Sequence, residues 1–308
     1  MKKKIASCCL VSTLFSVKNS DDKTHKIVTL CGIKFKFKRS AKTFPKAKGE
    51  LRNLQLANAC VLRIFDKILN KNNLTYWLDH GTLLGSIRHK GYIPWDDDID
   101  IAMPRKDYEK VRNQIYKEFE VLGFELNQGE GYTKQILRFL YKNSALQIDI
   151  FPHETYYKKT NKEEKQELYK SISDCYNTFY KKFPQEDLRS DKIKFDINEL
   201  LKFQNEIVYK NNPSIEGGTI FNGCEFLTYA KPEIYDWEDI YPLKKREFEG
   251  YKFNIPNNYD KYLTQMYGDY MSLPKKVKTH KGIIEKLASN KSIENVKNEL
   301  YLLIDKIN

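Results

Sequence analysis

The run from Asp96 to Asp100 is the densest acidic cluster of the chain. In an extended strand the side chains alternate, so Asp96, Asp98 and Asp100 would share one face and Asp97 would lie on the other. Aligned carboxylates repel one another unless a cation neutralises them, and their oxygens suit hard divalent ions. Acidic runs are most often solvated turns, but this run passes directly into the apolar residues 101–103. The pattern therefore predicts a strand that binds Mg²⁺ or Mn²⁺.

A further carboxylate, Asp149, is the one charge in an otherwise apolar run from residue 146 to residue 152. A buried lone carboxylate is costly unless it is paired or bound to a metal. The two acidic strands could converge on a two-metal site that clamps the attacking and leaving oxygens in phosphoryl transfer. We expect Asp98, Asp100 and Asp149 to be catalytic metal ligands, with Asp96 as a further ligand. Asp149 would complete a second metal site or accept the proton of an incoming hydroxyl.

Groups that could bind phosphate precede the acidic run. Gly85 and Ser86, expected at a helix N-terminus, could offer backbone N–H groups to an anion. Arg88, His89 and Lys90 add three potential cations, and the Arg88 guanidinium is best suited to a bidentate phosphate contact. Without the acidic strand beside them, these three residues would be interpreted as a solvated basic turn.

These residues together carry a family resemblance. The pair Gly85-Ser86, eleven residues, and then Asp98-Ile99-Asp100, with Asp149 on a later strand, resembles the signature of the nucleotidyltransferase superfamily. The fuller string from Gly81 to Ile101 closely resembles the LicD family. LicD-like proteins transfer a phospho-group, such as phosphocholine from CDP-choline, to a sugar of a cell-surface glycan. The fukutin-related proteins, which use CDP-ribitol, are distant relatives.

The resemblance covers about residues 60–155 and 220–282, and it implies further substrate contacts. Asp97, Asp269, Lys276 and His280 are expected to bind substrate. Trp95 could stack on a base or a choline cation, or simply pack against the core. The sequence departs from the family pattern at residues 79–80 and 275–276. Neither departure changes the carboxylates, so they affect the identity of the substrate and not the chemistry.

The elements that position these residues follow from the spacing of apolar residues. Helices are expected at residues 50–73, 104–119, 161–183, 198–209, 259–266 and 284–307, and strands near 74–78, 96–103, 121–126, 135–141 and 146–152. This alternation predicts an α+β fold, with a nucleotidyltransferase-like mixed sheet flanked by helices. We expect a catalytic domain at 50–283 and a C-terminal helix at 284–308. Residues 155–215 would be a variable helical insertion that binds the acceptor glycan or only packs.

The basic charge of the chain is concentrated at its N-terminus. Of the formal net charge of +12, residues 1–50 contribute +10, with 13 Lys and Arg against 3 Asp and Glu. This distribution argues against a nucleic-acid groove across the fold and for a local patch that meets a polyanion. Residues 1–49 are expected to form a basic helix and hairpin extension, its strands joined by a two-residue turn at 31–32. It would lie on an anionic membrane or act as a solubilising tail.

The cellular location and the reaction follow as expectations. The six cysteines form no C-x-x-C pair, and no cleavage site follows the apolar residues 5–17. We expect a cytoplasmic protein, either free or peripheral on the inner face of the cell membrane. The resemblance implies metal-dependent transfer of a phospho-alcohol group from a CDP-linked donor to a glycan of the lipopolysaccharide, capsule or teichoic acid type, with release of CMP. The alternatives are a metal-dependent glycosyltransferase, a true nucleotidyltransferase, and a non-enzymatic adaptor built on residues 1–50.

Overall fold

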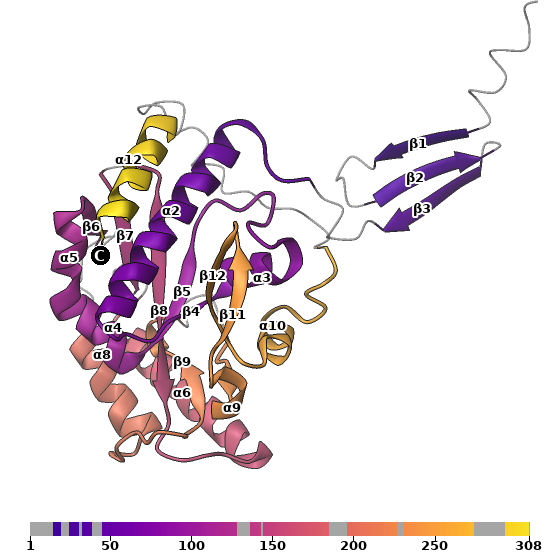
Figure 1. Cartoon of the computed structure of the whole chain (residues 1–308). Coiled ribbons are helices and arrows are strands. Elements are labelled where there is room, and N and C mark those ends of the chain that lie inside the picture. The colour runs from indigo at the N-terminus through magenta and orange to yellow at the C-terminus, as the bar shows by residue number, and fades with distance from the viewer. Residues whose placement is uncertain are drawn as a thin grey trace, which may run out of the picture.

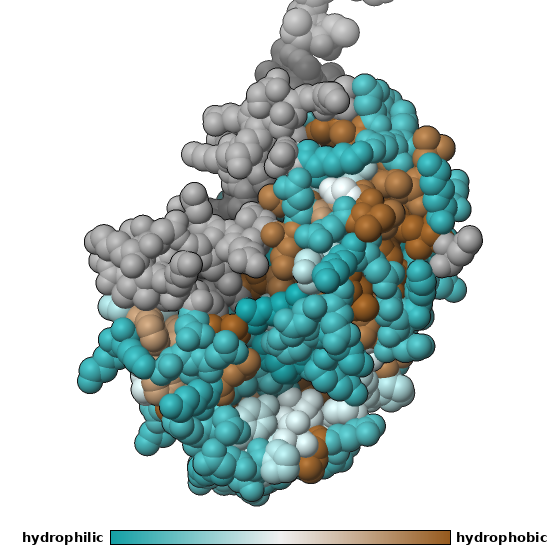
Figure 2. Space-filling model, turned by 90° about the vertical axis from the view of Figure 1, so that its left-hand side faces the viewer, coloured by the Kyte–Doolittle hydropathy of each residue, from teal (hydrophilic) through white to brown (hydrophobic). Residues whose placement is uncertain are grey.

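The computed structural model describes residues 15–19, 25–30, 33–38, 45–127, 136–142, 144–184, 196–226, 231–273 and 293–307. Its main body is an α+β fold in which helices flank a central mixed sheet, as the sequence predicts (Figure 1). Within the described residues, no helix is both long and apolar enough to cross a membrane. The face of the molecule shown in Figure 2 carries mainly hydrophilic side chains, and its apolar residues lie in separate patches.

The central sheet is organised around one long strand. This strand, β8, pairs in parallel with β5 along one side, while its other side pairs antiparallel first with β7 and then with β9. Outer strands complete the sheet: β4 beside β5, β6 beside β7, and β10 beside β9. The strands span Trp77–Leu78 (β4), Asp100–Pro104 (β5), Phe124–Asn127 (β6), Leu137–Tyr141 (β7), Gln147–Thr155 (β8), Ile220–Asn222 (β9) and Ile234–Tyr235 (β10).

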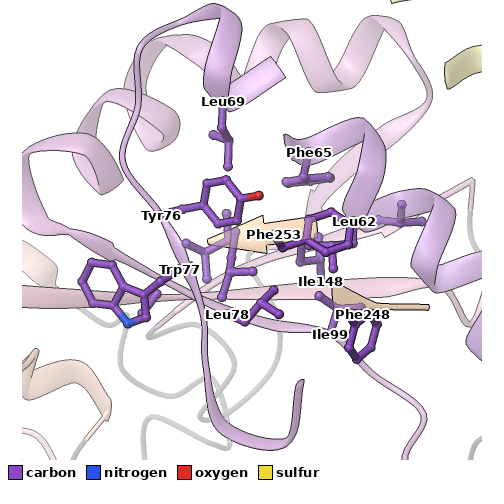
Figure 3. Packing of buried hydrophobic residues seen from close by; sticks show 14 of the residues in the cluster. Leu62, Phe65, Leu69, Tyr76, Trp77, Leu78, Ile99, Ile148, Phe248 and Phe253 are labelled. Atoms are coloured by element: carbon purple, nitrogen blue, oxygen red, sulfur yellow. The ribbon is translucent and has the colours of Figure 1, made fainter. Parts of the chain in front are cut away.

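Helix α2 (Gly49–Lys71) supplies one side of the main core, and its bounds match the predicted helix at 50–73. Leu62, Phe65 and Leu69 lie in one cluster with aromatic and aliphatic side chains of the sheet (Figure 3). Helix α12 (Ile293–Lys306) lies alongside α2 (Figure 1). The Lys67 ammonium secures this contact by donating to the carbonyls of Ile304 and Ile307, at 3.0 and 2.7 Å. The expected helix at 284–307 is therefore present from Ile293 onward, and residues 284–292 lie outside the described part.

The predicted helix at 104–119 is present but contains a π-helical turn. It consists of α4 (Arg105–Lys110), η2 (Val111–Ile115) and α5 (Tyr116–Val121). Pro104 precedes the first helical residue, where a missing N–H costs no intrahelical hydrogen bond. This helical segment connects β5 to β6, so the chain leaves the sheet at Pro104 and returns at Phe124.

The segment expected to be a helical insertion contains α6 (Lys162–Lys182), α8 (Ile197–Phe203) and η4 (Gln204–Val208). A capping box starts α6: the Asn161 side chain accepts from the Glu164 amide, and the Glu164 side chain accepts from the Asn161 amide. The apolar faces of these helices form a second core, separate from the main one, that includes Leu168, Ile172 and Phe179. The boundaries 155–215 remain a prediction.

Helix α3 (His80–His89) lies between β4 and β5 in the chain, and four shorter elements and one further helix follow the insertion. They are η5 (Cys224–Phe226), α9 (Trp237–Ile240), the hairpin of β11 (Lys244–Phe248) and β12 (Tyr251–Ile255), and α10 (Tyr259–Tyr267). Gly268 ends α10 with a positive φ of 65°, a backbone conformation that a glycine adopts without strain. The sequence predicts both this helix and its glycine end.

The N-terminal extension contains a three-stranded antiparallel sheet of its own. The predicted hairpin is confirmed as β2 (His25–Leu30) and β3 (Ile33–Lys38), in which Leu30 pairs with Ile33. A third strand, β1 (Phe15–Asn19), pairs with β2 and was not expected. Leu30, Ile33 and Phe35 are 44–62% exposed, and Lys34 and Lys36 are exposed as well. Residues 1–14 lie outside the described part.

Candidate active site

Two of the predicted catalytic carboxylates lie side by side in the sheet. Asp100 on β5 and Asp149 on β8 are register partners in the parallel pair, flanked by the buried pair Ile101 and Ile150. Both are buried, with 9% of Asp100 and 4% of Asp149 exposed. The apolar neighbours fix each strand in the core, so the two charges have to share a small region of the sheet.

The acidic residues before β5 are not in a strand, contrary to the prediction of an extended run from 96 to 100. The strand begins at Asp100, and residues 96–99 form an irregular loop. Side chains of α2 take the place of a neighbouring strand: Gln55 donates to the Asp96 carbonyl and Asn58 to the Asp97 carbonyl, both at 2.8 Å. The predicted alternation of faces is therefore wrong for Asp97. One carboxylate oxygen each of Asp96, Asp97 and Asp98 lie within 4.8 Å of one another.

This crowding of negative charge fits a divalent cation. Burial and the nearby charges of Asp98 and Asp149 raise the pKa of Asp100 well above its ordinary value, and Asp96 and Asp79 add to the effect. The donor set consists of oxygen atoms only, which is the set that Mg²⁺ and Mn²⁺ prefer. The metal itself stays a prediction.

Asp149 has a partner that the sequence analysis missed. Arg138 on β7 lies directly opposite Asp149 in the antiparallel register. Its Nε and Nη2 atoms donate to the two carboxylate oxygens at 2.6 and 2.5 Å, a bidentate arrangement. Arg138 is the one cation within an apolar strand, as Asp149 is the one anion, and this matching pattern was the available signal.

Helix α3 (His80–His89) begins earlier than the sequence analysis expects. Asp79 is its N-cap, and its carboxylate accepts from the His80 amide at 2.8 Å. The amides of the first turn, which include Gly81 and Thr82, have no acceptor within the helix. The Thr82 hydroxyl accepts from the Asp100 amide at 2.9 Å, which ties the helix start to β5.

Gly81 lets the acidic loop approach this helix start closely. A Cβ at residue 81 would lie 2.7 Å from Oδ2 of Asp96. The carboxylate of Asp96 therefore rests against the first turn of α3, where the partial positive charge of the helix favours an anion. A side chain at residue 81 would therefore displace the Asp96 carboxylate from this position.

The expectation that Gly85 and Ser86 stand at a helix N-terminus is wrong, and their binding of phosphate stays a prediction. Both lie inside α3, where helical hydrogen bonds occupy the backbone amides. A Cβ at Gly85 would lie 2.4 Å from the Gly91 carbonyl oxygen, so this glycine permits close packing of the loop that follows the helix. The Ser86 hydroxyl donates to the Leu83 carbonyl at 2.8 Å. In the structure, these two residues shape α3 and the loop that follows it.

The three predicted cations after Ser86 differ in their surroundings. Arg88 is buried and donates from Nη1 to the carbonyls of Tyr270 and Ser272, at 2.8 and 3.4 Å, so it holds the segment after α10 in place. Burial and the charge of Arg88 lower the pKa of His89 to about 4, which makes it neutral near pH 7. Lys90 is exposed at the left-handed C-cap of α3. Lys90 is thus the most exposed of the three, and their binding of phosphate stays a prediction.

A buried polar network supports the start of α3. Asp79 is fully buried, accepts from the Tyr262 hydroxyl at 2.8 Å and lies 3.1 Å from Nδ1 of His80. Burial alone would raise the pKa of Asp79, but His80, His153 and Tyr262 together lower it to about 2. His153 is itself buried, and burial lowers its pKa to about 4. In the sequence, the pair at 79–80 is a departure from the family pattern; in the fold, it supports the start of α3.

Two further residues border the site without having been predicted. Glu233 accepts from the Tyr235 hydroxyl at 2.8 Å. The negative charges of Asp79 and Glu233 both raise the pKa of His80. Tyr267 is 44% exposed, yet burial of its hydroxyl and the charges of Asp100 and Asp79 raise its pKa. No local pattern marks Glu233, because only the pairing of β10 with β9 brings it near α3.

The remaining predicted substrate residues are placed as follows. Trp95 is half-buried and packs against the main core. Asp269 is exposed in the turn after α10, where it accepts from the Ser272 hydroxyl. Lys276 and His280 lie outside the described residues.

Comparison with known proteins gives the following similarities. Residues 73–197 match the family described as LicD/FKTN/FKRP, nucleotidyltransferase domain. The chain is 28% identical over 255 residues to the lipopolysaccharide cholinephosphotransferase LicD of Haemophilus influenzae, covering 74% of this chain and 93% of that protein. It is 28% identical over 92 residues to the human ribitol-5-phosphate transferase FKTN, covering 30% of this chain and 19% of that protein. It is 34% identical over 71 residues to mannosyltransferase regulator 4 of Saccharomyces cerevisiae, covering 23% of this chain and 6% of the yeast protein.

Proposed function

Because the chain is a transferase of the LicD family, we propose that it moves a phospho-alcohol group from a CDP-linked donor to a sugar hydroxyl of a cell-surface glycan. The donor group would be phosphocholine-like, the acceptor a lipopolysaccharide, capsule or teichoic acid, and the leaving group CMP. The names of two relatives, a cholinephosphotransferase and a ribitol-5-phosphate transferase, support transfer of a phosphate-bearing alcohol.

The observation that carries this proposal is the convergence of carboxylates beside the start of α3. Asp100 and Asp149 are paired in register, and the loop of Asp96 to Asp98 lies immediately before β5. Phosphoryl transfer depends mainly on positioning and charge neutralisation, and little on covalent chemistry from the protein. An acidic cluster next to the open amides of a helix is suited to that task.

Each residue has a proposed role. Asp98, Asp100 and Asp149, with Asp96, would hold Mg²⁺ or Mn²⁺. When bound, this ion would neutralise charge on the donor pyrophosphate. The first-turn amides of Gly81 and Thr82 would donate to phosphate oxygens, in the role first expected of Gly85 and Ser86.

Arg138 would keep the Asp149 carboxylate fixed in place. Each oxygen of Asp149 retains a further lone pair beyond its bond to Arg138, so Asp149 can complete a metal site or accept a proton.

The test measures CMP release from four donors, CDP-choline, CDP-ethanolamine, CDP-glycerol and CDP-ribitol, with Mg²⁺, Mn²⁺ or a chelator. We expect metal-dependent release from one donor, and a loss of at least about 100-fold in the double variant Asp98→Asn/Asp100→Asn. The matched control is Glu163→Gln/Asp174→Asn, which removes two exposed carboxylates from α6 and should keep full activity.

Product analysis separates the alternatives. Turnover of UDP- or GDP-sugars, with no CMP from any of the four donors, would replace the proposal by a glycosyltransferase. Release of pyrophosphate with a nucleotidylated product would establish a nucleotidyltransferase. CMP release that persists in the double variant would remove Asp98 and Asp100 from the catalytic site.

We also propose that residues 1–49 hold the protein at an anionic membrane surface on the cytoplasmic side. The support is the exposed apolar trio Leu30, Ile33 and Phe35 next to Lys34 and Lys36, since each lysine near anionic headgroups contributes about 1 kcal/mol. The full chain should sediment with phosphatidylglycerol vesicles and not with phosphatidylcholine vesicles. A chain lacking residues 1–44 should lose this binding and keep CMP release. Equal sedimentation of both chains would contradict this role.

A further inference from the structure

A hollow of about 320 Å³ lies between the insertion and the catalytic body. Its volume falls at the lower end of the range for small-ligand sites. Helix α6 contributes one side, and the segment around β10 together with α10 contributes the other. The lining residues are Lys165, Gln166, Tyr169, Pro232, Ile234 and Gln265.

The lining combines apolar surface with neutral hydrogen-bonding groups. Tyr169 is 40% exposed, and Pro232 and Ile234 add aliphatic surface beside it. The exposed side chains of Gln166 and Gln265 each offer an amide donor and an amide acceptor. A pyranose has the matching chemistry, because its C–H faces pack on an aromatic ring while its hydroxyl groups hydrogen-bond to amides.

The charges around the hollow favour a neutral ligand over an anionic one. Lys165 is the one cation among the lining residues, and its ammonium lies 2.6 Å from Oδ1 of Asp236. Asp236 also accepts from Lys261 at 2.9 Å, so the three residues form a local ion network. A phosphate or nucleotide would need a cation that is not already neutralised.

One thin wall separates this hollow from the start of α3. Pro232 and Ile234 line the hollow, while Tyr235, which follows Ile234 in β10, points to the opposite side and donates from its hydroxyl to Glu233. There the Tyr235 ring stacks on Tyr262 with centroids 4.4 Å apart, and Tyr262 donates to Asp79.

Helix α10 also links the hollow to the buried network at Asp79. Gln265 lines the hollow and is exposed, and Tyr262, three residues earlier on the same side of α10, is buried and donates to Asp79. The residues next to the hollow therefore adjoin those that support the start of α3.

We propose that the hollow binds one neutral pyranose of the acceptor glycan, near the sugar whose hydroxyl reacts. The identification of the ligand as acceptor rests on the proposed function, whereas sugar binding itself does not. Because α6 belongs to the expected insertion, this segment would set which glycan the enzyme accepts.

Binding is tested with the methyl glycosides of glucose, galactose, mannose, N-acetylglucosamine and N-acetylgalactosamine, by saturation-transfer NMR on the full chain. We expect at least one glycoside to bind wild type, and Tyr169→Ala to raise its dissociation constant about tenfold through loss of ring packing. Tyr169→Phe should bind like wild type. Gln265→Ala, on the other wall, should also weaken binding. The control Tyr301→Ala removes an equally exposed tyrosine, 41%, from α12 and should leave binding unchanged.

Two results would overturn the proposal. One is that none of the five glycosides binds the wild-type chain. The other is that Tyr169→Ala and Gln265→Ala bind as wild type does. CMP release without acceptor, measured on the same variants, keeps the proposed function separate. If the wild type releases no CMP but binds a glycoside through Tyr169, the proposed donor chemistry fails and the sugar site stands.

Discussion

Arg138 and Asp149 are a matched pair of opposite charges in two apolar strands. Both side chains are largely buried, and both oxygens of the carboxylate accept from the guanidinium. Removing one member of such a pair leaves the other charge buried without compensation, which costs more than the pair contributes. The pair therefore constrains which substitutions the site tolerates.

Arg138→Met should lower the free energy of unfolding by about 3 kcal/mol, because it leaves the Asp149 carboxylate uncompensated. Urea denaturation at neutral pH measures this change. Arg112→Met is the control, since Arg112 makes only a 3.8 Å contact with Glu109 at the surface and should change stability by less than about 1 kcal/mol. Replacing Asp149 by Asn in the Arg138→Met background should cost less than it does in wild type. Additive losses would show that the two residues do not depend on each other.

The individual carboxylates were predictable from the sequence because a charge within an apolar run needs a partner. Asp100 and Asp149 are such charges, and the structure places them side by side as the sequence predicts. Arg138 is also a charge within an apolar run. Its partner depends on the register of the strands, which a single sequence does not show. Glu233 and Tyr267 approach the site only through the tertiary fold.

At the scale of elements, α3 shows how two glycines in one helix serve different needs. A side chain at Gly81 would meet the carboxylate of Asp96, the end of a side chain that can move. A side chain at Gly85 would meet the carbonyl of Gly91, which is backbone and cannot easily yield. The first position is constrained by the site and the second by packing.

Gly81→Ala should keep or slightly raise the melting temperature, since alanine favours a helix over glycine by about 1 kcal/mol. It should lower CMP release about tenfold or more, because Asp96 has to shift. Gly85→Ala should instead lower the free energy of unfolding by about 1–3 kcal/mol. Thermal melts and CMP assays are made on both variants, so that each variant serves as the control for the other. Full activity in Gly81→Ala would contradict a tight fit between Asp96 and the helix start.

The start of α3 differs from the expected one because Asp79, and not a glycine, caps the helix. An aspartate before a helical run is itself a start signal, and here its carboxylate accepts from the first helical amide. The extended run at 96–99 failed for another reason. Polar side chains of a distant helix, Gln55 and Asn58, hold that backbone, and no local pattern shows such contacts.

At the scale of the whole molecule, Glu249 joins segments that are far apart in the chain. Its carboxylate accepts from Lys46 and Arg52 before and within α2, and from the Tyr92 amide after α3. Glu249 itself lies in the turn between β11 and β12. Burial opposes its charge, but the hydrogen bonds from Arg52 and Lys46 lower the pKa of Glu249 from 4.5 to about 2.

This depressed pKa makes stability depend on pH in the acid range. The contribution is fully present above pH 4.5 and is lost as the pH falls toward 2, because the unfolded chain takes up the proton first. Between pH 6 and pH 3, wild type should lose about 2 kcal/mol more stability than Glu249→Gln. Urea denaturation at both pH values measures the difference, with Glu163→Gln as a surface control. Equal losses in wild type and Glu249→Gln would show that Glu249 does not hold these segments together.

The fold class was predictable from the sequence because helical and strand periodicities alternate along the chain. Those patterns gave the mixed sheet flanked by helices, and the long helix α2 was predicted to within two residues at each end. The third strand of the N-terminal sheet was missed. An apolar stretch that follows a lysine run also resembles a targeting segment, and only pairing with β2 identifies residues 15–19 as a strand.

The contacts of the loop between α3 and β5 also have a consequence for its motion. Its amides at Tyr92 and Asp96 donate to Glu249 and to the Ile93 carbonyl, and the amide of Asp100, the first residue of β5, donates to Thr82. Amides bonded in this way exchange with deuterium only when the structure around them opens. A segment with no regular secondary structure should therefore exchange as slowly as the strands beside it, so that its charges stand in position before any substrate arrives.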